Sequence, residues 1–394
     1  MMDEYAATYK NVIGWRRHLH QYPELSFQEE KTAQFVYDTL SSFGNLDISR
    51  PTRTSVVARL IGSRTGKRIG LRADMDALPI QEEHESDFSS RHSGVMHACG
   101  HDGHTAMLLG AAEILSQRKD EIRGEVYFIF QHAEEVHPGG AQEMVQAGVT
   151  DHLDMCLAIH LFSAMPLGKI GLASGAVTAN SDRFDITIQG KGGHASQPEQ
   201  CVDPLVIASQ LISHLQTISS RHTDPAERLV LSVTMCSAGS AYNVIPDTVT
   251  LGGTLRTFKE EIREQAKLRM EQIIKGVTEA HGASYEFDFR HGYKSVVNDR
   301  DITELVKQAA VSLWGEEQVF PLEPMMGGED FSAFSERVPS CYIALGAGGE
   351  EMIYPHHHPK FTFDENALPA GVKLFVNSVF FILNSHHTFS VKAY

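Results

Sequence analysis

The chain has 394 residues, of which 42% are hydrophobic, and this length exceeds what one hydrophobic core usually organises. We therefore expect two globular domains. The formal charge is −16, from 34 basic and 50 acidic residues that are scattered among one another, so nucleic acid is not expected as a partner.

The start of the sequence carries acidic residues and lacks the apolar core of a secretory signal. The longest uninterrupted apolar runs, such as residues 126–130, are far shorter than the roughly 20 residues that span a bilayer. Five cysteines, an odd number spread along the chain, favour reduced thiols over a disulfide framework. We expect a cytoplasmic protein with no membrane partner, and we interpret residues 385–394 as a tail without a role.

The first part of the chain alternates strands and helices, which is typical of a largely parallel sheet with helices on both faces. Residues 11–43 predict helix, broken by a turn at 22–24, with Ser26 and Glu29 as a capping box that opens the second piece. Strands and helices then follow in the order strand, strand, helix, strand, helix, strand, at 56–62, 69–75, 104–119, 125–131, 140–148 and 155–160.

The pattern changes between residues 181 and 293, where the predicted order is strand, helix, strand, strand, helix, strand. That order is the split pattern of a ferredoxin-like sandwich and is self-contained. The segments concerned are 183–191, 203–221, 228–236, 248–257, 260–281 and 284–292.

After this module, residues 301–314 and 366–384 predict helices and residues 342–348 predict a short strand. The predicted fold class is therefore α/β, with a mostly parallel sheet flanked by helices and interrupted by an inserted α+β domain. The discontinuous domain comprises 1–180 and 294–394, and the inserted domain comprises 181–293.

The densest group of reactive residues is MHACGHDGH at 96–104, in which Cys99 and His101 are two residues apart. In an extended segment, side chains at this spacing point the same way and could address one site. Thiolate and imidazole suit zinc or a neighbouring transition ion, and a helix beginning near His104 would favour the thiolate. The alternative is a glycine-rich turn with hydrogen-bonded surface histidines.

A second group is HAEE at 132–135, directly after an apolar strand that ends at Gln131. The carboxyl ends of parallel strands are where open α/β sheets place their sites. Of two neighbouring carboxylates, one could bind metal while the other accepts a proton from water. Taken alone, a Glu-Glu dipeptide is more often a solvated acidic turn.

Two further histidine segments complete the pattern. His160 closes the apolar strand in AIHL, and three histidines lie in YPHHHPKF at 354–361. A single histidine at a strand end is more often structural than a ligand. Because successive strands deliver such residues to one edge, however, five or six ligands could share one cleft, a number that suits two ions.

Taken together, these segments resemble the metal-dependent aminoacylases and carboxypeptidases. The resemblance is to the branch of bacterial N-acyl-amino-acid amidohydrolases, hippurate hydrolases and plant auxin-conjugate hydrolases, and it runs from about residue 10 to 384. The matching motifs are RADMDALP (72–79), MHACGHDGH, HAEE, AIHL, GKGGHASQP (190–198), NVIP (243–246), TLRTF (254–258), GGEDF (327–331) and HHHPKF (356–361).

The resemblance implies two divalent ions per subunit, of zinc, manganese, cobalt or nickel, and a catalytic base, Glu134. Among the three consecutive histidines, the family pattern of histidine, variable residue and proline selects His357, with His356 a weaker candidate. The thiolate of Cys99 is expected to bridge the ions. The implied metal ligands are Cys99, His101, Glu135, His160 and His357.

Some positions depart from the family pattern. Other members usually carry a histidine ligand at the position of Asp74, a difference for which Cys99 would compensate. Asp76 is implied to orient a ligand, and Asp102 could do the same. His132 replaces a common proline and Gly328 a common serine, and neither change removes a reactive group.

The inserted domain is implied to be a lid that also forms the interface of a homodimer or higher homo-oligomer. His194 would reach into the partner subunit's cleft, bind substrate and stabilise the developing oxyanion. Asn243 and Arg256 would hold the substrate's carboxylate. On residue type alone, Arg256 is more often a charged strand residue that faces water.

The implied activity is hydrolysis of the amide bond of N-acyl-L-amino acids by a metal-activated water, with Glu134 as general base. One alternative is a dipeptidase, aminopeptidase or carboxypeptidase that uses the same site on short peptides. A second is a thiol hydrolase with Cys99 as covalent nucleophile. A third, from another class, is a catalytically silent protein that keeps the fold for metal storage or partner recognition.

Overall fold

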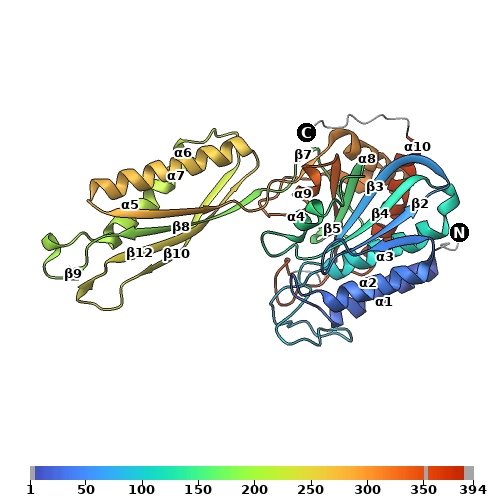
Figure 1. The fold of residues 1–394 in the computed structure, drawn as a ribbon, viewed down its shortest axis with the longest axis horizontal. Coiled ribbons are helices and arrows are strands. Elements are labelled where there is room, and N and C mark those ends of the chain that lie inside the picture. Colours follow the sequence, from blue (N-terminus) through green and yellow to red (C-terminus); the bar gives the residue numbers. More distant parts are fainter. Residues whose placement is uncertain (1–4, 350–353, 386–394) are drawn as a thin grey trace. The chain divides into compact units, whose positions relative to one another are not determined.

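The computed structural model describes residues 5–349 and 354–385, and the predicted tail from residue 386 onward lies outside them. The chain forms two compact units (Figure 1). Unit 1 contains the described parts of Met1–Val177, Val296–Pro324 and Asp330–Tyr394, and unit 2 contains Thr178–Ser295 and Met325–Glu329.

Unit 1 is built on an eight-stranded sheet whose four central strands, β4, β3, β5 and β16, run parallel to one another. Strands β1 and β2 add antiparallel pairs at one edge, and β6 and β15 form a parallel pair at the other. The order across the sheet is β1 (Leu46–Ser49), β2 (Val56–Ile61), β4 (Arg123–Gln131), β3 (Arg64–Asp74), β5 (Met155–Pro166), β16 (Ser340–Gly348), β6 (Ile170–Leu172) and β15 (Val319–Pro321). The predicted mostly parallel sheet flanked by helices is confirmed.

Helices α1, α2 and α10 of unit 1 pack around α3, which is buried along nearly its whole length. A helix that is apolar on all sides is stable only inside a core. The helices are α1 (Ala6–Gln21), α2 (Glu30–Phe43), α3 (His101–Gln117), α4 (Gly140–Gln146), α8 (Arg300–Trp314), α9 (Ser332–Ser335) and α10 (Ala367–Asn384), with 3-10 turns η1 (Lys119–Glu121) and η3 (Glu316–Gln318) and the short strands β7 (Gly175–Ala176) and β14 (Val297–Asn298).

Helix α10 has the length and composition of a membrane-crossing helix, although its uninterrupted apolar runs are short. In the structure, 56% of this segment is buried. Its buried side chains, which include Leu374, Phe375 and Val379, join the core of unit 1, and the helix packs on α3 and α8. This is the position of a core helix.

Unit 2 has a four-stranded antiparallel sheet in the order β10, β12, β8, β13. Counted along the chain, the four strands lie in the order 2-3-1-4, with α5 and α7 packed against them and against each other. Phe184, Ile186 and Ile188 alternate into its separate core. The elements are β8 (Asn180–Gln189), β9 (Gly193–His194), η2 (Pro198–Gln200), α5 (Pro204–Leu215), α6 (Thr217–Arg221), β10 (Leu229–Ala238), β11 (Val244–Ile245), β12 (Thr248–Thr257), α7 (Glu260–Ala280) and β13 (Ser284–Arg290).

Three local predictions are wrong. No capping box opens α2, because Glu29 makes no side-chain cap and the hydroxyl of Ser26 donates to Asp76 instead. Helix α3 begins at His101 rather than near His104, because Gly100 adopts the left-handed conformation that starts the helix early. Strand β5 does not close at His160 but continues to Pro166, because it stays paired with β16.

We predict opposite effects on stability for two helical glycines. In α3, a Cβ on Gly110 would lie 2.5 Å from Val12 and 2.9 Å from Val372, both stiff β-branched side chains. Gly110→Ala should therefore lower the free energy of unfolding by roughly 1–3 kcal/mol despite the helix preference of alanine.

Gly14 in α1 is the matched control, because nothing lies within 4 Å of the position of its Cβ. Gly14→Ala should raise the free energy of unfolding by up to about 1 kcal/mol. Denaturant titrations of both variants measure the difference. Equal effects of the two substitutions would contradict the close packing of α3 between α1 and α10.

Candidate metal centre

The carboxyl ends of neighbouring parallel strands bring acidic residues to one edge of the sheet of unit 1. Strand β3 ends at Asp74 directly beside Gln131, the last residue of β4. Asp76 follows the first strand, and Glu134 and Glu135 follow the second. Strand β5 pairs with the other side of β3 and carries His160. This is the edge at which open α/β sheets place their sites.

Cys99 and His101 reach the same edge by a turn rather than by an extended segment. Gly100 between them has a φ of 93°, and His101 is the first residue of α3. The Sγ atom of Cys99 lies 3.6 Å from Nε2 of His160. The prediction of a shared site for this pair therefore does not depend on the strand geometry that was assumed for it.

The six residues predicted as ligands or base lie in three overlapping groups, and the candidate ligand atoms in each group are within 4.8 Å of one another. Nε2 of His357 lies 3.2 Å from Oε1 of Glu135, which is 3.8 Å from Nε2 of His101. The groups are Cys99, His101 and His160; Cys99, Glu135 and His357; and His101, Glu134 and Glu135.

Two atoms at the centre of this cluster are buried and make no hydrogen bond to the described residues: Nε2 of His101 and Oε1 of Glu135. Burying unpaired polar atoms is costly, so such atoms indicate a missing partner. The surrounding carboxylates also attract positive charge. Burial alone would lower the pKa of His101, but Asp74, Asp76 and Glu135 outweigh it and raise this pKa to about 10. The residues therefore fit a bound cation.

Both buried histidines are oriented by carbonyl oxygens. Nδ1 of His101 lies 2.9 Å from the carbonyl of Asp76, and Nδ1 of His160 lies 2.8 Å from that of Leu161. Because a carbonyl only accepts hydrogen bonds, each Nδ1 carries the proton and each Nε2 faces the cluster. Burial and the neighbouring His104 and His356 hold the pKa of His160 well below its usual range, which keeps this ring neutral, as metal ligation requires.

The predicted effect of the helix terminus on Cys99 is not observed. Burial, followed by the charges of Glu135 and Glu134, raises the pKa of the Cys99 thiol well above its usual range. The direction of this pKa shift favours the thiol when no cation is bound. A bound metal ion is the partner that would stabilise the thiolate.

The turn that presents Glu134 and Glu135 is held by Asp76 and by Glu29, which lies outside the matching motifs. Ala133 adopts a left-handed conformation, with φ 50°, which is uncommon for residues other than glycine. Its N–H donates to the buried carboxylate of Glu29 at 2.8 Å, and the N–H of Glu135 donates to Asp76 at 3.0 Å. The loop between α1 and α2 thus fixes the backbone on which both carboxylates stand.

The two aspartates predicted to orient ligands differ in their contacts. Asp76 accepts from Nδ1 of His101 through both its carbonyl and its carboxylate. Asp102 instead contacts Arg16 at 2.9 Å and His20 at 2.8 Å, both from α1. Because neither partner of Asp102 is a predicted ligand, Asp102 does not orient one in this structure.

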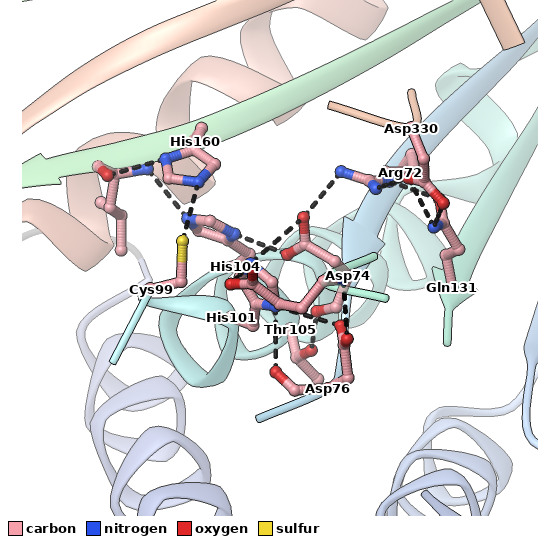
Figure 2. A network of polar contacts seen from close by, with 12 residues as sticks. Arg72, Asp74, Asp76, Cys99, His101, His104, Thr105, Gln131, His160 and Asp330 are labelled. Atoms are coloured by element: carbon pink, nitrogen blue, oxygen red, sulfur yellow. Dashed lines mark hydrogen bonds and ion pairs between the residues drawn. The ribbon is translucent and has the colours of Figure 1, made fainter. Parts of the chain in front are cut away.

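Asp74 belongs to a buried network that sequence reasoning did not predict (Figure 2). Its carboxylate accepts from Arg72 at 2.7 Å and from Nδ1 of His104 at 2.6 Å. Arg72 also donates to Asp330 and Gln131. The only sequence signal for this network was that Asp74 stands where other family members carry a ligand.

The remaining predicted residues lie in unit 2. His194 and Asn243 are neighbours, because Val244 pairs with His194 and the N–H of Ala195 donates to the carbonyl of Asn243. Arg256 lies near the end of β12, and its guanidinium donates to Thr254 and to backbone carbonyls rather than to a carboxylate. Strand β12 runs roughly 27 Å from Thr248 to Arg256, and Val244 lies four residues before Thr248. The unit therefore holds His194 and Asn243 at the opposite end of its sheet from Arg256.

The contacts of His194 determine which of its ring nitrogens can donate a hydrogen bond. The backbone N–H and the hydroxyl of Ser196 both lie within hydrogen-bond distance of its Nδ1, at 3.2 and 2.8 Å. Because an N–H can only donate, Nδ1 is the acceptor, and a neutral ring carries its proton on Nε2. The ring is exposed, so this N–H is available to a partner.

Fold and cluster together describe a class of protein with a candidate metal centre of sulfur, nitrogen and oxygen donors at the carboxyl edge of an α/β sheet, an arrangement suited to metal-assisted hydrolysis. Comparison with known proteins identifies the family. The model of Peptidase family M20/M25/M40 matches residues 70–380, and the chain belongs to this family.

Relatives in the family are amide hydrolases. An N-acyl-L-amino acid amidohydrolase of Geobacillus stearothermophilus is 60% identical over 288 residues, which cover 73% of this chain and 78% of that protein. Thermostable carboxypeptidase 1 of Saccharolobus solfataricus is 40% identical, over 91% of this chain and 92% of its own length. A dinuclear metal-binding peptidase of Bacillus subtilis superposes with a TM-score of 0.86 at 36% identity, covering 96% and 99% of the two chains. This chain is a metal-dependent amidohydrolase.

We predict a pH signature for Glu29 in the metal-free protein. Burial and the charge of Asp76 raise its pKa from 4.5 to about 7. Because the folded state holds the proton more tightly, stability from this group is full below pH 4.5 and is lost as the pH rises through about 7. The loss amounts to roughly 3 kcal/mol.

Glu29→Gln keeps an oxygen acceptor for Ala133 but cannot ionise. Unfolding of the metal-free variant should therefore lose less stability between pH 5 and pH 8 than unfolding of the metal-free wild type does. Thermal melts of both proteins across this range provide the measurement. Parallel stability profiles would show that the buried carboxyl does not titrate as described.

Proposed function

We propose that the protein hydrolyses the amide bond of N-acyl-L-amino acids, as aminoacylases and hippurate hydrolases do, with two divalent ions held by Cys99, His101, Glu135, His160 and His357. The observation that carries the proposal is the convergence of these side chains with Glu134 in one cluster. Thiolate, imidazole and carboxylate together suit zinc, manganese, cobalt or nickel.

When bound, the ions would acidify a water molecule and polarise the acyl oxygen of the substrate. Glu134 stands beside His101 and Glu135 and is 7% exposed. In this position its carboxylate accepts the proton of the attacking water and returns it to the nitrogen of the leaving amine. Burial strengthens these charge interactions by excluding solvent from the reacting groups.

The alternative in which Cys99 is the nucleophile receives less support. Burial and Glu135 raise the pKa of its thiol, whereas a nucleophilic cysteine needs a lowered pKa. A silent binding protein would not need a carboxylate base next to the ligand cluster. Metal-assisted attack by water is therefore the mechanism that we propose.

In unit 2, we assign His194 to the oxyanion through its exposed Nε2–H. Asn243 and Arg256 would bind the substrate's carboxylate. His194 and Asn243 lie at the opposite end of the sheet from Arg256. We therefore propose that His194 and Asn243 serve the active site of a partner subunit. The residues of one active site would then come from both chains of a homodimer.

The exposed edge strand β10 supports this association. It ends the sheet of unit 2 and exposes Val230 and Met235, and α5 beside it exposes Leu205 and Val206. Unpaired strand edges with apolar neighbours are favoured sites of pairing between chains. We propose that this strand edge pairs with a second copy of the chain.

We also propose that the protein is located in the cytoplasm.

The substrate class is tested by comparing N-acetyl and N-benzoyl amino acids with free dipeptides. We expect kcat/KM to be at least about tenfold higher for the acyl amino acids, the difference that 1.4 kcal/mol of transition-state binding supplies. A higher value for dipeptides would favour the peptidase alternative, which the carboxypeptidase among the relatives keeps open.

The same assays test the mechanism. Glu134→Gln should lower kcat by about 100-fold or more while metal content is kept, because the amide cannot accept a proton. Exhaustive chelation should abolish activity, and added divalent ions should restore it. Activity that survives chelation but is lost on alkylation of thiols would support the Cys99 nucleophile instead.

Contribution of His194 across the dimer is tested by mixing two inactive variants, Glu134→Ala and His194→Ala. A mixed dimer contains one site with both residues intact, so random exchange of subunits should restore about a quarter of wild-type activity. The control mixes two Glu134→Ala preparations, which should remain inactive. Failure of the first mixture to gain activity, with exchange shown by mass spectrometry, would place His194 in its own subunit's site.

A further inference from the structure

Both carboxylate oxygens of Asp74, the residue at which the family resemblance implies a ligand in other members, are held by protein groups (Figure 2). Oδ2 accepts from Arg72 at 2.7 Å, and Oδ1 is 2.6 Å from Nδ1 of His104. Its carbonyl accepts from the hydroxyl of Thr105 at 2.8 Å. All these side chains are buried. Asp74 is thus held rigidly, and His104 is the contact that connects it to the metal centre.

Arg72 anchors the other side of this aspartate. Its guanidinium is 2% exposed and bridges Asp74 to Asp330, which it contacts at 2.9 Å. A planar guanidinium that pairs with carboxylates on two sides fixes their orientation. Asp330 is further held by the amide of Gln131 and by the N–H of Ala141.

The contacts of His104 determine its tautomer. Its Nδ1 faces the carboxylate of Asp74, which can only accept, so Nδ1 carries a proton. Its Nε2 receives the backbone N–H of Leu161 at 2.9 Å and is therefore the unprotonated acceptor. With both ring nitrogens engaged, His104 is not available as a metal ligand, although its ring lies 4.4 Å from that of His160.

The backbone of Leu161 is the point where this network meets the metal centre. Its N–H is held by His104, and its carbonyl oxygen accepts from Nδ1 of His160 at 2.8 Å and from Nε2 of His356 at 2.9 Å. The same carbonyl therefore sets the tautomer of His160 and turns its Nε2 toward Cys99, 3.6 Å away. A shift of the Leu161 backbone would therefore move His160.

We propose that His104 is a positioning residue for the metal centre. Anchored by Asp74, it holds the backbone N–H of Leu161, the residue whose carbonyl fixes His160 in the ligating tautomer and orientation. The inference rests on the proposed function, because it takes His160 as a ligand. It also accounts for the aspartate at position 74, whose ligand role is replaced by a supporting one. Loss of a group that orients a ligand typically weakens metal binding by 10–100-fold.

The test measures affinity for Co²⁺ by competition with a chelator and follows the thiolate-to-cobalt absorption that reports the ion bound to Cys99. We expect His104→Ala to weaken the affinity by about 10–100-fold. His104→Gln should recover most of it, since its amide oxygen can accept the Leu161 N–H. His104→Asn, which is too short to reach that N–H, should not.

Leu108→Ala is the matched control, because it empties a buried position one turn further along α3. It should lower thermal stability and leave Co²⁺ affinity unchanged. An equal loss of affinity in Leu108→Ala and His104→Ala would reduce the role of His104 to general packing and overturn the proposal. If His104→Ala does not fold, the other two variants provide the test. Equal Co²⁺ affinity of His104→Gln and His104→Asn would then overturn the proposal.

A double-mutant cycle with His160→Ala separates this inference from the proposed function. If His104 acts through His160, the double variant should bind Co²⁺ no more weakly than His160→Ala alone. Additive losses would overturn the positioning role while leaving the ligand set intact. Wild-type affinity in His160→Ala would instead contradict the ligand set and, with it, the proposed function.

Discussion

The carboxylates of Asp74, Asp76, Glu134 and Glu135 gather with buried histidines at one edge of a parallel sheet, and the rest of the unit is arranged to tolerate this concentration of charge. Buried carboxylates are costly unless they are paired or coordinate a cation. Arg72 donates to Asp74, and the N–H of Glu135, the hydroxyl of Ser26 and the ring of His101 donate to Asp76. Oε1 of Glu135 and Nε2 of His101, 3.8 Å apart, make no hydrogen bond to the described residues, and this is where the proposed metal ion would bind.

The ligands are positioned mainly through the backbone. The N–H groups of Ala133 and Glu135 are held by Glu29 and Asp76, and the Leu161 peptide is held by His104. Each contact joins a buried side chain to a peptide group next to a reactive residue. Because each of these N–H groups is fixed by a buried carboxylate or imidazole, the centre is preorganised before an ion or substrate binds.

The candidate site residues Cys99, His101, Glu134 and Glu135 could be predicted from the sequence, because the proposed chemistry requires particular side-chain types in short motifs, and the structure brings them together. The parallel sheet followed from the alternation of apolar strands and helices. The start of α3 was misplaced because it depends on the left-handed conformation of Gly100, which motif spacing does not reveal.

Supporting contacts were much harder to predict. Glu29 meets Ala133 across 104 residues, and Arg72 meets Asp330 across 258, so no local pattern links them. The partners of Asp102 were also missed, because a carboxylate beside a ligand gives no sign of which way it points. Tertiary packing turned Asp102 toward Arg16 and His20 of α1.

The central claim is that Cys99 and its neighbours hold paired cations. X-ray absorption spectroscopy of the zinc-loaded protein tests it directly, since it measures the atoms around the ion and their distances. The account predicts a sulfur neighbour at about 2.3 Å and a second metal at about 3.5–4 Å, with the sulfur signal lost in Cys99→Ser. A spectrum with only nitrogen and oxygen neighbours and no second metal would contradict it.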